Sequence, residues 1–348
     1  MQALVQPCDG VAPLVSGISG AKKSVEIVIF RFDEREIEQA LEMAVARGVF
    51  VHALIAYTNG GSEKNLRKLE ASLLAAGVTV ARTADDLGRY HDKLMIIDRQ
   101  VLYLMTFNYT HLDINHSRSL GLVTENKQIV QEAVKLFEAD TTRQPYAPEL
   151  DNFIVSPANA RKELSAFIEG AQKQLLIYDG KLTDSEIIRL LQDRARAGVE
   201  VRVIGKVGKR GAGIKAVRLS ALRLHAQAII RDGVRVFLGS QSLRKAELDV
   251  RREVGLITDD PEVVQRLLAT FEADWSLSDS APQRLAPKKE SPLALAAMLK
   301  EAVKDVVKGV VVEAGVVGTE VRKEMKEAVQ EAVKEAVKEA VNETNPIN

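Results

Sequence analysis

An internal repeat constrains the fold of this chain more than any other feature of its sequence. At an offset of 150 residues, the two copies match at Pro7 and Pro157, residues 18–23 and 168–173, and residues 46–49 and 196–199. At an offset of 134 residues, they match at His91 and His225, Asp98 and Asp232, residues 121–122 and 255–256, and residues 137–140 and 271–274. One deletion of 16 residues in the second copy reconciles the two offsets. The chain is therefore expected to fold as two copies of one unit, with the same order of elements in each.

The hydrophobic pattern within each copy predicts strands that alternate with helices. In the first copy, the expected elements are an amphipathic segment at 11–23, a strand at 25–30, a helix at 34–47, and strands at 49–56 and 78–82. An additional helix at 62–76 occupies the region that the second copy lacks. Hairpins are expected at 93–98 with 101–107 and at 227–231 with 234–239. Strands that alternate with helices, together with a hairpin, predict the α/β class with a mixed sheet.

Composition and charge narrow the class of protein. Lys+Arg and Asp+Glu number 48 each, so the net charge is zero, which weakens the case for a nucleic-acid or membrane coat protein but allows a local basic cleft. The single cysteine, Cys8, excludes an intramolecular disulfide framework and a multi-cysteine zinc site. The sequence has no recognisable secretory signal and no apolar run long enough to cross a bilayer, so we expect a cytoplasmic protein.

The repeats end near Trp275, and the composition changes beyond it. We expect repeat 1 at 1–147, repeat 2 at 148–277, a linker at 278–292 and a helical tail at 293–348 rich in Ala, Val, Glu and Lys. The Ala-Val stripe of the tail recurs every four residues, so it drifts by about 40° per repeat and forms no long straight seam. The tail leaves three interpretations open: self-association or packing on the repeats, a free solvated helix, and, less favoured because of its mixed charge, contact with a membrane surface.

A cluster of polar residues occurs at the same place in both copies. The first copy carries His91, Lys93 and Asp98, followed on the next strand by Thr106 and Asn108. The equivalent residues of the second copy are His225, Gln227, Asp232, Ser240 and Ser242. Residues i and i+2 of a strand point to the same face, so each histidine projects together with the residue two positions later. Reaction at a phosphodiester needs a nucleophile, a proton donor for the leaving oxygen and donors for the non-bridging oxygens, all of which two such clusters supply.

The duplicated pattern resembles the signature of the phospholipase D superfamily, H-x-K-x4-D-x6-G-S-x-N, and the resemblance extends over residues 7–275. It implies two α/β/α sandwich halves with mixed sheets, related by a pseudo-twofold axis, to which this chain adds its C-terminal helical tail. It also implies that one histidine forms a covalent phosphohistidine while the other protonates the leaving group, and that no metal or other cofactor is required. His91 is then the expected nucleophile, because its copy keeps the intact motif, and His225 is the expected acid and base.

The same resemblance assigns roles to the remaining motif residues. Asp98, Asp232 and Glu253 are expected to set the orientation and basicity of the histidines, with Glu253 acting on the histidine of the other half. Lys93 and Gln227 belong to the catalytic set, and the residues expected to bind or support the phosphate are Thr106, Asn108, Ser240 and Ser242.

This chain departs from the family pattern mainly in its second copy. Gln227 replaces the motif lysine and Ser242 the motif asparagine, so half of the cationic charge expected at the phosphate is missing. Ser119 stands where the first copy would carry the equivalent of Glu253. The candidates to restore the missing charge are Arg223, Arg231 and Lys206.

Three functions remain open. The favoured substrate is a phospholipid, whose phosphodiester would be hydrolysed or transferred by a protein peripheral to the membrane. A nuclease of the same chemistry is the second reading, and the basic run from Lys206 to Arg223 would bind its substrate or steer any other anion. The third is an inactive phosphate-binding protein, in line with Gln227 and Ser242. The other histidines, at 52, 111 and 116, are expected to be structural or on the surface.

Overall fold

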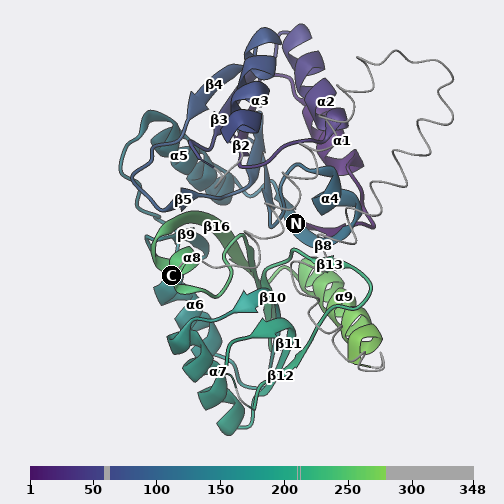
Figure 1. The fold of residues 1–348 in the computed structure, drawn as a ribbon, viewed down its shortest axis with the longest axis vertical. Helices are drawn as coiled ribbons and strands as arrows, with labels where there is room; N and C mark the ends of the chain where they lie inside the picture. Colours follow the sequence, from purple (N-terminus) through teal and green to yellow (C-terminus); the bar gives the residue numbers. More distant parts are fainter. Residues whose placement is uncertain (59–62, 210, 212, 280–348) are drawn as a thin grey trace, which may run out of the picture. The chain divides into compact units, whose positions relative to one another are not determined.

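The computed structural model describes residues 1–58, 63–209, 211 and 213–279, and Figure 1 shows their arrangement. The chain divides into two units, Met1–Ser280 and Ala281–Asn348. The expected tail at 293–348, and all but the first two residues of the expected linker at 278–292, lie outside the described residues. None of the helices in the described ranges is long and apolar enough to cross a membrane.

The first repeat is built on a mixed sheet of eight strands. Their order is β1-β8-β7-β6-β2-β3-β4, and β13 also pairs with β8. The bounds are β1 Gln2–Gln6, β2 Ser24–Ile29, β3 Phe50–Ile55, β4 Thr79–Arg82, β6 Leu94–Ile97, β7 Val101–Met105, β8 Ser117–Thr124 and β13 Arg223–Leu224. Strands β2, β3 and β4 are parallel, whereas β6 and β7 form the expected antiparallel hairpin beside β2.

The second repeat has an equivalent sheet of eight strands. Their order is β12-β11-β10-β14-β15-β16-β5, and β9 also pairs with β16. The bounds are β5 Arg89–Tyr90, β9 Phe153–Ser156, β10 Gln174–Leu182, β11 Glu200–Val207, β12 Lys215–Val217, β14 Ala228–Arg231, β15 Arg235–Gly239 and β16 Arg251–Thr258. Strands β10, β11 and β12 are parallel, and β14 and β15 form the second expected hairpin. The α/β class with mixed sheets is confirmed.

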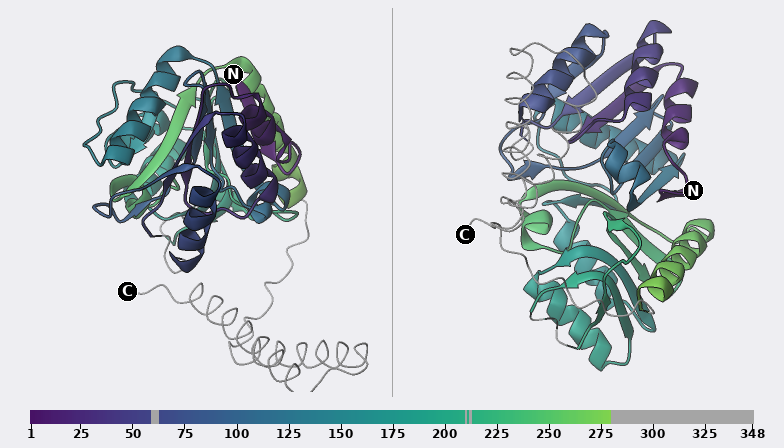
Figure 2. Two further views of the ribbon diagram at one scale, coloured as in Figure 1. Left: turned by 90° about the horizontal axis from the view of Figure 1, so that it is seen from above. Right: turned by 45° about the vertical axis from the view of Figure 1, so that its right-hand side comes forward.

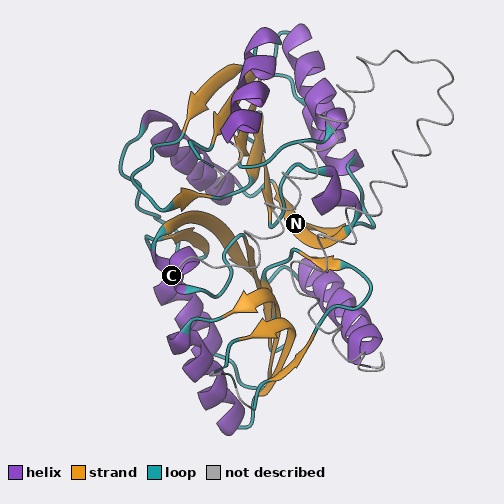
Figure 3. Cartoon of the chain, in the orientation of Figure 1, coloured by secondary structure: helices purple, strands orange, loops and turns teal. Residues whose placement is uncertain are grey.

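Helices cover both faces of each sheet, as Figure 3 shows. Their bounds are α1 Ala12–Gly20, α2 Arg35–Ala46, α3 Glu63–Ala75, α4 His111–Asn115, α5 Lys127–Thr142, α6 Ala160–Glu169, α7 Ser185–Arg196, α8 Lys245–Asp249 and α9 Pro261–Asp279. Helices α1 to α3 share an apolar core with the outer face of the first sheet, and α6 and α7 do so with the second. The inner faces of both sheets, with α5 and α9, form one continuous core. Each half is therefore the predicted α/β/α sandwich.

The first parallel crossover shows how the sequence specifies these layers. In α2, the apolar residues Ile37, Leu41 and Ala44 recur at three- and four-residue spacing and are all fully buried against the sheet. Gly48 then takes a φ of +83°, a left-handed conformation that costs glycine little, and the chain turns into β3. The helix thus ends where the sequence predicts.

Each sheet includes a two-residue strand from the other repeat: β5 joins β16, and β13 joins β8. In Figure 2 the long green strand β16 runs along the boundary between the two repeats. Two buried ion pairs also connect the repeats. Arg118 lies 2.7 Å from Asp274, and Arg252 lies 3.0 Å from Asp140. These pairs are equivalent at the 134-residue offset, so a pseudo-twofold axis relates the repeats. Removing one partner of such a buried pair typically costs about 3–5 kcal/mol, because the other charge is left buried without compensation.

Candidate active site

Both motif histidines lie at the junction of the repeats. His91 follows β5 and His225 follows β13, which are the two exchanged strands. The backbone N–H of His91 donates to the carbonyl oxygen of Arg252 at 2.8 Å, and that of His225 donates to the carbonyl oxygen of Arg118 at 2.9 Å. The hydroxyl of Thr106 also donates across the junction, to the carbonyl oxygen of His225 at 2.9 Å. Each histidine is therefore held by the other repeat.

His91 is surrounded by one acid, one base and one aromatic ring. Both carboxylate oxygens of Glu253, from the second repeat, lie 3.0 Å from its Nδ1, as the resemblance implied. The Lys93 Nζ lies 3.0 Å from each ring nitrogen of His91. The edge of the His91 ring meets Phe30, with 4.5 Å between the ring centroids. Glu253 and Lys93 are both fully buried, so their charges act on the histidine with little screening by water.

Burial shifts the pKa values of this cluster toward neutral forms. Burial, and then the Lys93 charge, lower the pKa of His91 well below its usual value. Burial lowers the pKa of Lys93 to about 8, against the opposing effect of Glu253. Burial also raises the pKa of Glu253, although Lys93 opposes this. His91 is therefore neutral near pH 7 and keeps a lone pair on its ring.

His225 has a different set of partners. Its Nδ1 lies 2.7 Å from Oδ1 of Asp113, and the Arg223 Nη1 lies 2.6 Å from the same oxygen. Asn108 donates its side-chain N–H to the other Asp113 oxygen at 2.8 Å. Burial would raise the pKa of Asp113, but the hydrogen bond and charge of His225 hold it well below its usual range. Burial lowers the pKa of His225, and the Asp113 carboxylate opposes that shift.

Asp113 contacts His225 and is not among the residues that the sequence pattern singles out. The first repeat was expected to lack an acid because Ser119 occupies the position equivalent to Glu253. The structure supplies the acid from α4 instead, and the Ser119 hydroxyl donates to the carbonyl oxygen of Asp113. A signal was available in the repeat, since Glu247 stands at the 134-residue offset from Asp113. Glu247 accepts from the Ser242 amide at 2.7 Å, as Asp113 does from the Asn108 amide at 3.0 Å.

The residues expected to bind phosphate are nearly fully buried and make hydrogen bonds within the protein. Asn108 and Thr106 support the surroundings of His225, as described above. The Ser242 hydroxyl donates to Asp179 at 2.7 Å. The Ser240 hydroxyl accepts from the Val254 amide at 3.1 Å, next to Glu253 in the chain. The contacts seen for these four residues are with the protein frame around the histidines.

The two motif aspartates do not join the histidines, which corrects the expectation that they act on them. The Asp98 carboxylate accepts from the backbone amides of Lys22, Lys23 and Ser24, where α1 leads into β2. Asp232 does the same, at the equivalent place, for residues 172–174. Each aspartate follows a strand that begins beside its histidine, so roughly 20 Å separates the two ends. Their role is to hold the turn between helix and strand.

Gln227 leaves the second repeat without its motif lysine. It is half-buried, and its Oε1 has no hydrogen-bond partner among the described residues. Of the three candidates for the missing charge, Arg223 is the one that contacts His225, at 3.2 Å from Nδ1. Arg231 instead stacks on Phe167 at the other end of β14. Arg223 therefore brings a guanidinium beside His225, although its position corresponds to Arg89 and not to Lys93.

The other histidines behave largely as expected. His52 packs between Phe50 and Phe137, at centroid distances of 5.8 and 5.3 Å, and is structural. His111 and His116 are exposed and contact each other at 5.2 Å. In the described part of the chain, no three His, Cys, Asp or Glu side chains are grouped to hold a metal ion.

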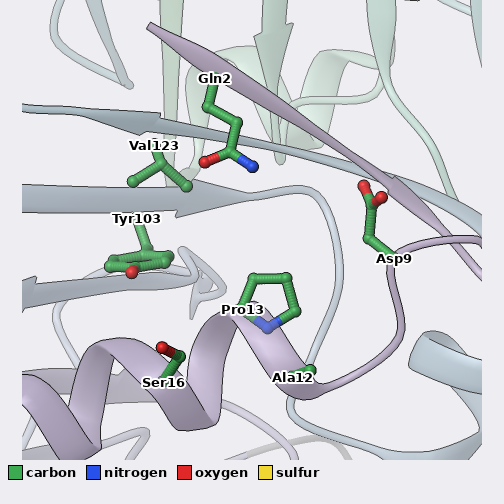
Figure 4. A pocket seen from close by; sticks show the side chains of 7 residues that line it. All are labelled: Gln2, Asp9, Ala12, Pro13, Ser16, Tyr103 and Val123. Atoms are coloured by element: carbon green, nitrogen blue, oxygen red, sulfur yellow. The ribbon is translucent and has the colours of Figure 1, made fainter.

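A separate hollow of about 450 Å³ opens on the first repeat, between α1 and strands β1, β7 and β8 (Figure 4). Its lining residues are Gln2, Asp9, Ala12, Pro13, Ser16, Tyr103 and Val123. The Asp9 carboxylate is already bound by Arg266 and by the Val5 amide. The hollow contains none of the motif residues, so the junction of the repeats is the candidate active site.

Comparison with known proteins supports the same assignment. A family model described as "Cardiolipin synthase, PLD-like domain" matches residues 14–141 and 164–275. These two segments cover more than half of the chain, and each contains one histidine cluster.

Two curated relatives match at lower identity. Polyphosphate kinase of Staphylococcus haemolyticus is 23% identical over 311 residues, which are 80% of this chain and 43% of that protein. Mitochondrial cardiolipin hydrolase of Mus musculus is 28% identical over 145 residues, which are 39% of this chain and 62% of that protein. The chain thus spans less than two thirds of the length of either relative.

Two solved structures share the fold. Polyphosphate kinase from Porphyromonas gingivalis gives a TM-score of 0.65 at 20% identity, over 78% of this chain and 50% of that one. Phosphatidylserine synthase from Haemophilus influenzae Rd KW20 gives a TM-score of 0.59 at 12% identity, over 79% of this chain and 85% of that one. Identities this low establish the fold alone.

Proposed function

The chain belongs to the family of the cardiolipin synthase, PLD-like domain, and from this premise we propose that it hydrolyses or transfers a phosphodiester through a phosphohistidine. The observation that carries the proposal is that each histidine has a carboxylate at Nδ1, Glu253 for His91 and Asp113 for His225. A carboxylate at Nδ1 fixes the ring and leaves Nε2 for the reaction. Two such rings at one junction supply a nucleophile and a proton donor.

We assign His91 as the nucleophile, because burial and Lys93 keep its ring neutral. His225 is the acid, because the Asp113 carboxylate at its Nδ1 opposes the lowering of the His225 pKa by burial. In the first step, Nε2 of His91 bonds to phosphorus, the bond from phosphorus to the leaving oxygen breaks, and His225 gives its proton to that oxygen. In the second step, His225 takes a proton from water or an alcohol, whose oxygen bonds to phosphorus and releases His91. The protons balance over the two steps, and we propose that neither step uses a metal.

The substrate that we propose is a phospholipid. The names of a matched family, a curated relative and a solved structure refer to cardiolipin or phosphatidylserine, which are phospholipids. Cationic side chains from both repeats, Arg89, Arg223 and Arg251, contact or act on the histidine clusters and suit an anionic head group. A lipid substrate would require contact with a membrane surface, and we propose a cytoplasmic protein that is peripheral to the membrane.

A second candidate is a protein that binds phosphate-containing ligands without turnover. Gln227 favours it, because a half-buried amide with an unpartnered oxygen replaces a charged donor. Loss of one preorganised donor typically lowers a rate by about 10² to 10³. A nuclease of the same chemistry differs from the lipid proposal in substrate alone.

The test is intact-protein mass spectrometry after rapid, acid-free quenching of a reaction with a generic phosphodiester and EDTA. Wild type is compared with His91→Ala and His225→Ala, and with His116→Ala, an exposed histidine, as the matched control. We expect a phosphoryl-type adduct in wild type, in His116→Ala and in His225→Ala, and none in His91→Ala.

The other outcomes are also decisive. An adduct in His91→Ala that is absent from His225→Ala would keep the chemistry and exchange the two roles. No adduct and no turnover of lipid or nucleotide diesters, in a protein that still binds phosphate, would favour the binding protein. Turnover of a nucleic acid, with lipids untouched, would replace the phospholipid as substrate.

A further inference from the structure

Three cationic side chains lie over the ring of Phe30, which is in contact with His91. The Arg89 Cζ lies 5.3 Å from the ring centroid, the Lys93 Nζ 5.8 Å and the Arg31 Cζ 5.9 Å. The ring itself is almost fully buried and touches His91 at 4.5 Å. Cations over an aromatic face are held in place by its quadrupole. Phe30 therefore lies beside two arginines, the half-buried Arg89 and the exposed Arg31, next to the proposed nucleophile.

These two arginines have no carboxylate partner among the described residues. Glu247, which is equivalent to Asp113 at the 134-residue offset, is bound by Arg244 and lies 2.9 Å from Arg251. Arg89 is half-buried, and burial, followed by the charge of Arg251, lowers its pKa against the opposing charge of Glu253. A guanidinium that is partly desolvated and repelled by its neighbours is unfavourable unless an anion binds it.

In the second repeat, the equivalent arginine is ion-paired with a carboxylate. Arg223 is equivalent to Arg89 at the 134-residue offset, and each stands two residues before its histidine. Arg223 is paired with Asp113 at 2.6 Å. The acid equivalent to Asp113 in the other half is Glu247, which is engaged elsewhere, so Arg89 keeps its charge available. The two halves have thus diverged at this position.

We infer that Arg89 and Arg31, held on Phe30, form a second anion subsite that binds a further phosphate group of the substrate. The proposal rests on the function proposed above and names a substrate class for the same site: a molecule with a second phosphate a few bonds from the one that His91 attacks. Arg89 binds that second phosphate and positions the first. The shared chemistry is the phosphate pair, which a lipid with two phosphates or a short polyphosphate provides.

The first experiment measures binding and needs no catalysis. Isothermal titration calorimetry at fixed ionic strength compares tripolyphosphate with orthophosphate for the full chain. The variants are Arg89→Gln, Arg31→Gln and Arg89→Lys, with Arg196→Gln as the control, since Arg196 is 71% exposed in the last turn of α7. Melting temperatures check that each variant is folded.

We expect wild type to bind tripolyphosphate at least about tenfold more tightly than orthophosphate, because two sites act on one ligand. Arg89→Gln should weaken tripolyphosphate binding by about 10- to 100-fold and orthophosphate binding far less. Arg89→Lys should retain most of the affinity, and Arg196→Gln all of it. Equal losses for both ligands in Arg89→Gln, or the same loss in Arg196→Gln, would overturn the proposal.

A second experiment separates the sources of the phosphate pair. Cardiolipin and phosphatidylglycerol, in matched mixed micelles, are compared as substrates for wild type and Arg89→Gln. A higher KM for cardiolipin alone, with kcat unchanged, supports the subsite and a lipid with two phosphates. Unchanged lipid kinetics, with tripolyphosphate binding lost, supports the subsite and a soluble source. If the mass-spectrometric test fails while the Arg89-dependent binding persists, the subsite stands and the proposed reaction falls.

Discussion

The Glu253 carboxylate, carried by the second repeat, lies 3.0 Å from Nδ1 of His91 in the first repeat. Because Glu253 is fully buried on β16 and that strand pairs with β5, the backbone fixes the acid and the histidine together. The contact links the motif of one half to the sheet of the other, and it sets the orientation of the proposed nucleophile.

Glu253→Gln should slow formation of the phosphoryl adduct by about 10²- to 10³-fold, because the amide no longer stabilises the positive charge that develops on His91. KM should change little, since Glu253 is fully buried and contacts His91. Single-turnover kinetics measure the effect, with Glu262→Gln, an exposed acid on α9, as the control. A loss confined to KM would show that Glu253 acts on substrate binding instead.

Asp113→Asn should move the alkaline limb of the kcat profile to lower pH. The Asp113 carboxylate raises the pKa of His225 against the lowering effect of burial, so removing its charge lets that pKa fall. His225 must carry a proton to act as the acid, hence activity declines at a lower pH than in wild type. The maximal rate should fall by about 10- to 100-fold. An unchanged profile with a reduced rate would assign Asp113 a structural role.

Gln227→Lys should raise kcat/KM by less than about tenfold, because Arg223, although paired with Asp113, already places a charged donor beside His225. Steady-state kinetics are compared for wild type, Gln227→Lys, Arg223→Gln and the double variant, to test whether a lysine at position 227 can replace Arg223. The double variant should retain activity that Arg223→Gln alone loses. Measurable turnover in Gln227→Lys, when wild type shows none, would instead favour the phosphate-binding protein.

Asp92→Asn should stabilise the protein above pH 7. Burial raises the pKa of Asp92 to about 6, and its Oδ1 has no hydrogen-bond partner in the described part of the chain. A raised folded-state pKa means that the group favours folding when protonated, so stability is lost as pH rises from about 4 through 6. Asparagine removes this penalty, by about 1–3 kcal/mol at pH 8 and much less at pH 4.

Urea denaturation at pH 4, 6 and 8 tests the Asp92 prediction. Asp151→Asn, which changes an exposed acid, is the control and should track wild type at every pH. A difference between Asp92→Asn and wild type that does not depend on pH would show that Asp92 acts through packing and not through its charge.

The local parts of this molecule follow from the sequence, and the contacts across the junction do not. Hydrophobic spacing places α2 and the hairpins within a few residues, because those patterns reflect burial along one element. The contact of His225 with Asp113 depends on the position of α4 relative to β13 of the other repeat. The two residues are 112 positions apart in the chain. Periodicity contains no information on that approach.

The motif aspartates show a second limit. Asp98 and Asp232 stand at fixed spacing from the histidines, so the spacing alone favours a shared site. The structure gives another reason for that spacing: each caps three consecutive amides at the far end of the strand, which any copy of this fold must satisfy. A fixed spacing between two residues can therefore arise because the backbone needs a hydrogen-bond acceptor there, and not only because both residues take part in a reaction.

The exchange of β5 and β13 between the sheets has a consequence for synthesis on the ribosome. A nascent chain that ends before β16 has made His91 but not Glu253, and β5 has no strand to join. The same chain has not completed α9, whose Asp274 neutralises Arg118. The candidate site is therefore complete only after the second repeat has been made, and a half-made chain lacks both the strand that pairs with β5 and the carboxylate that contacts His91.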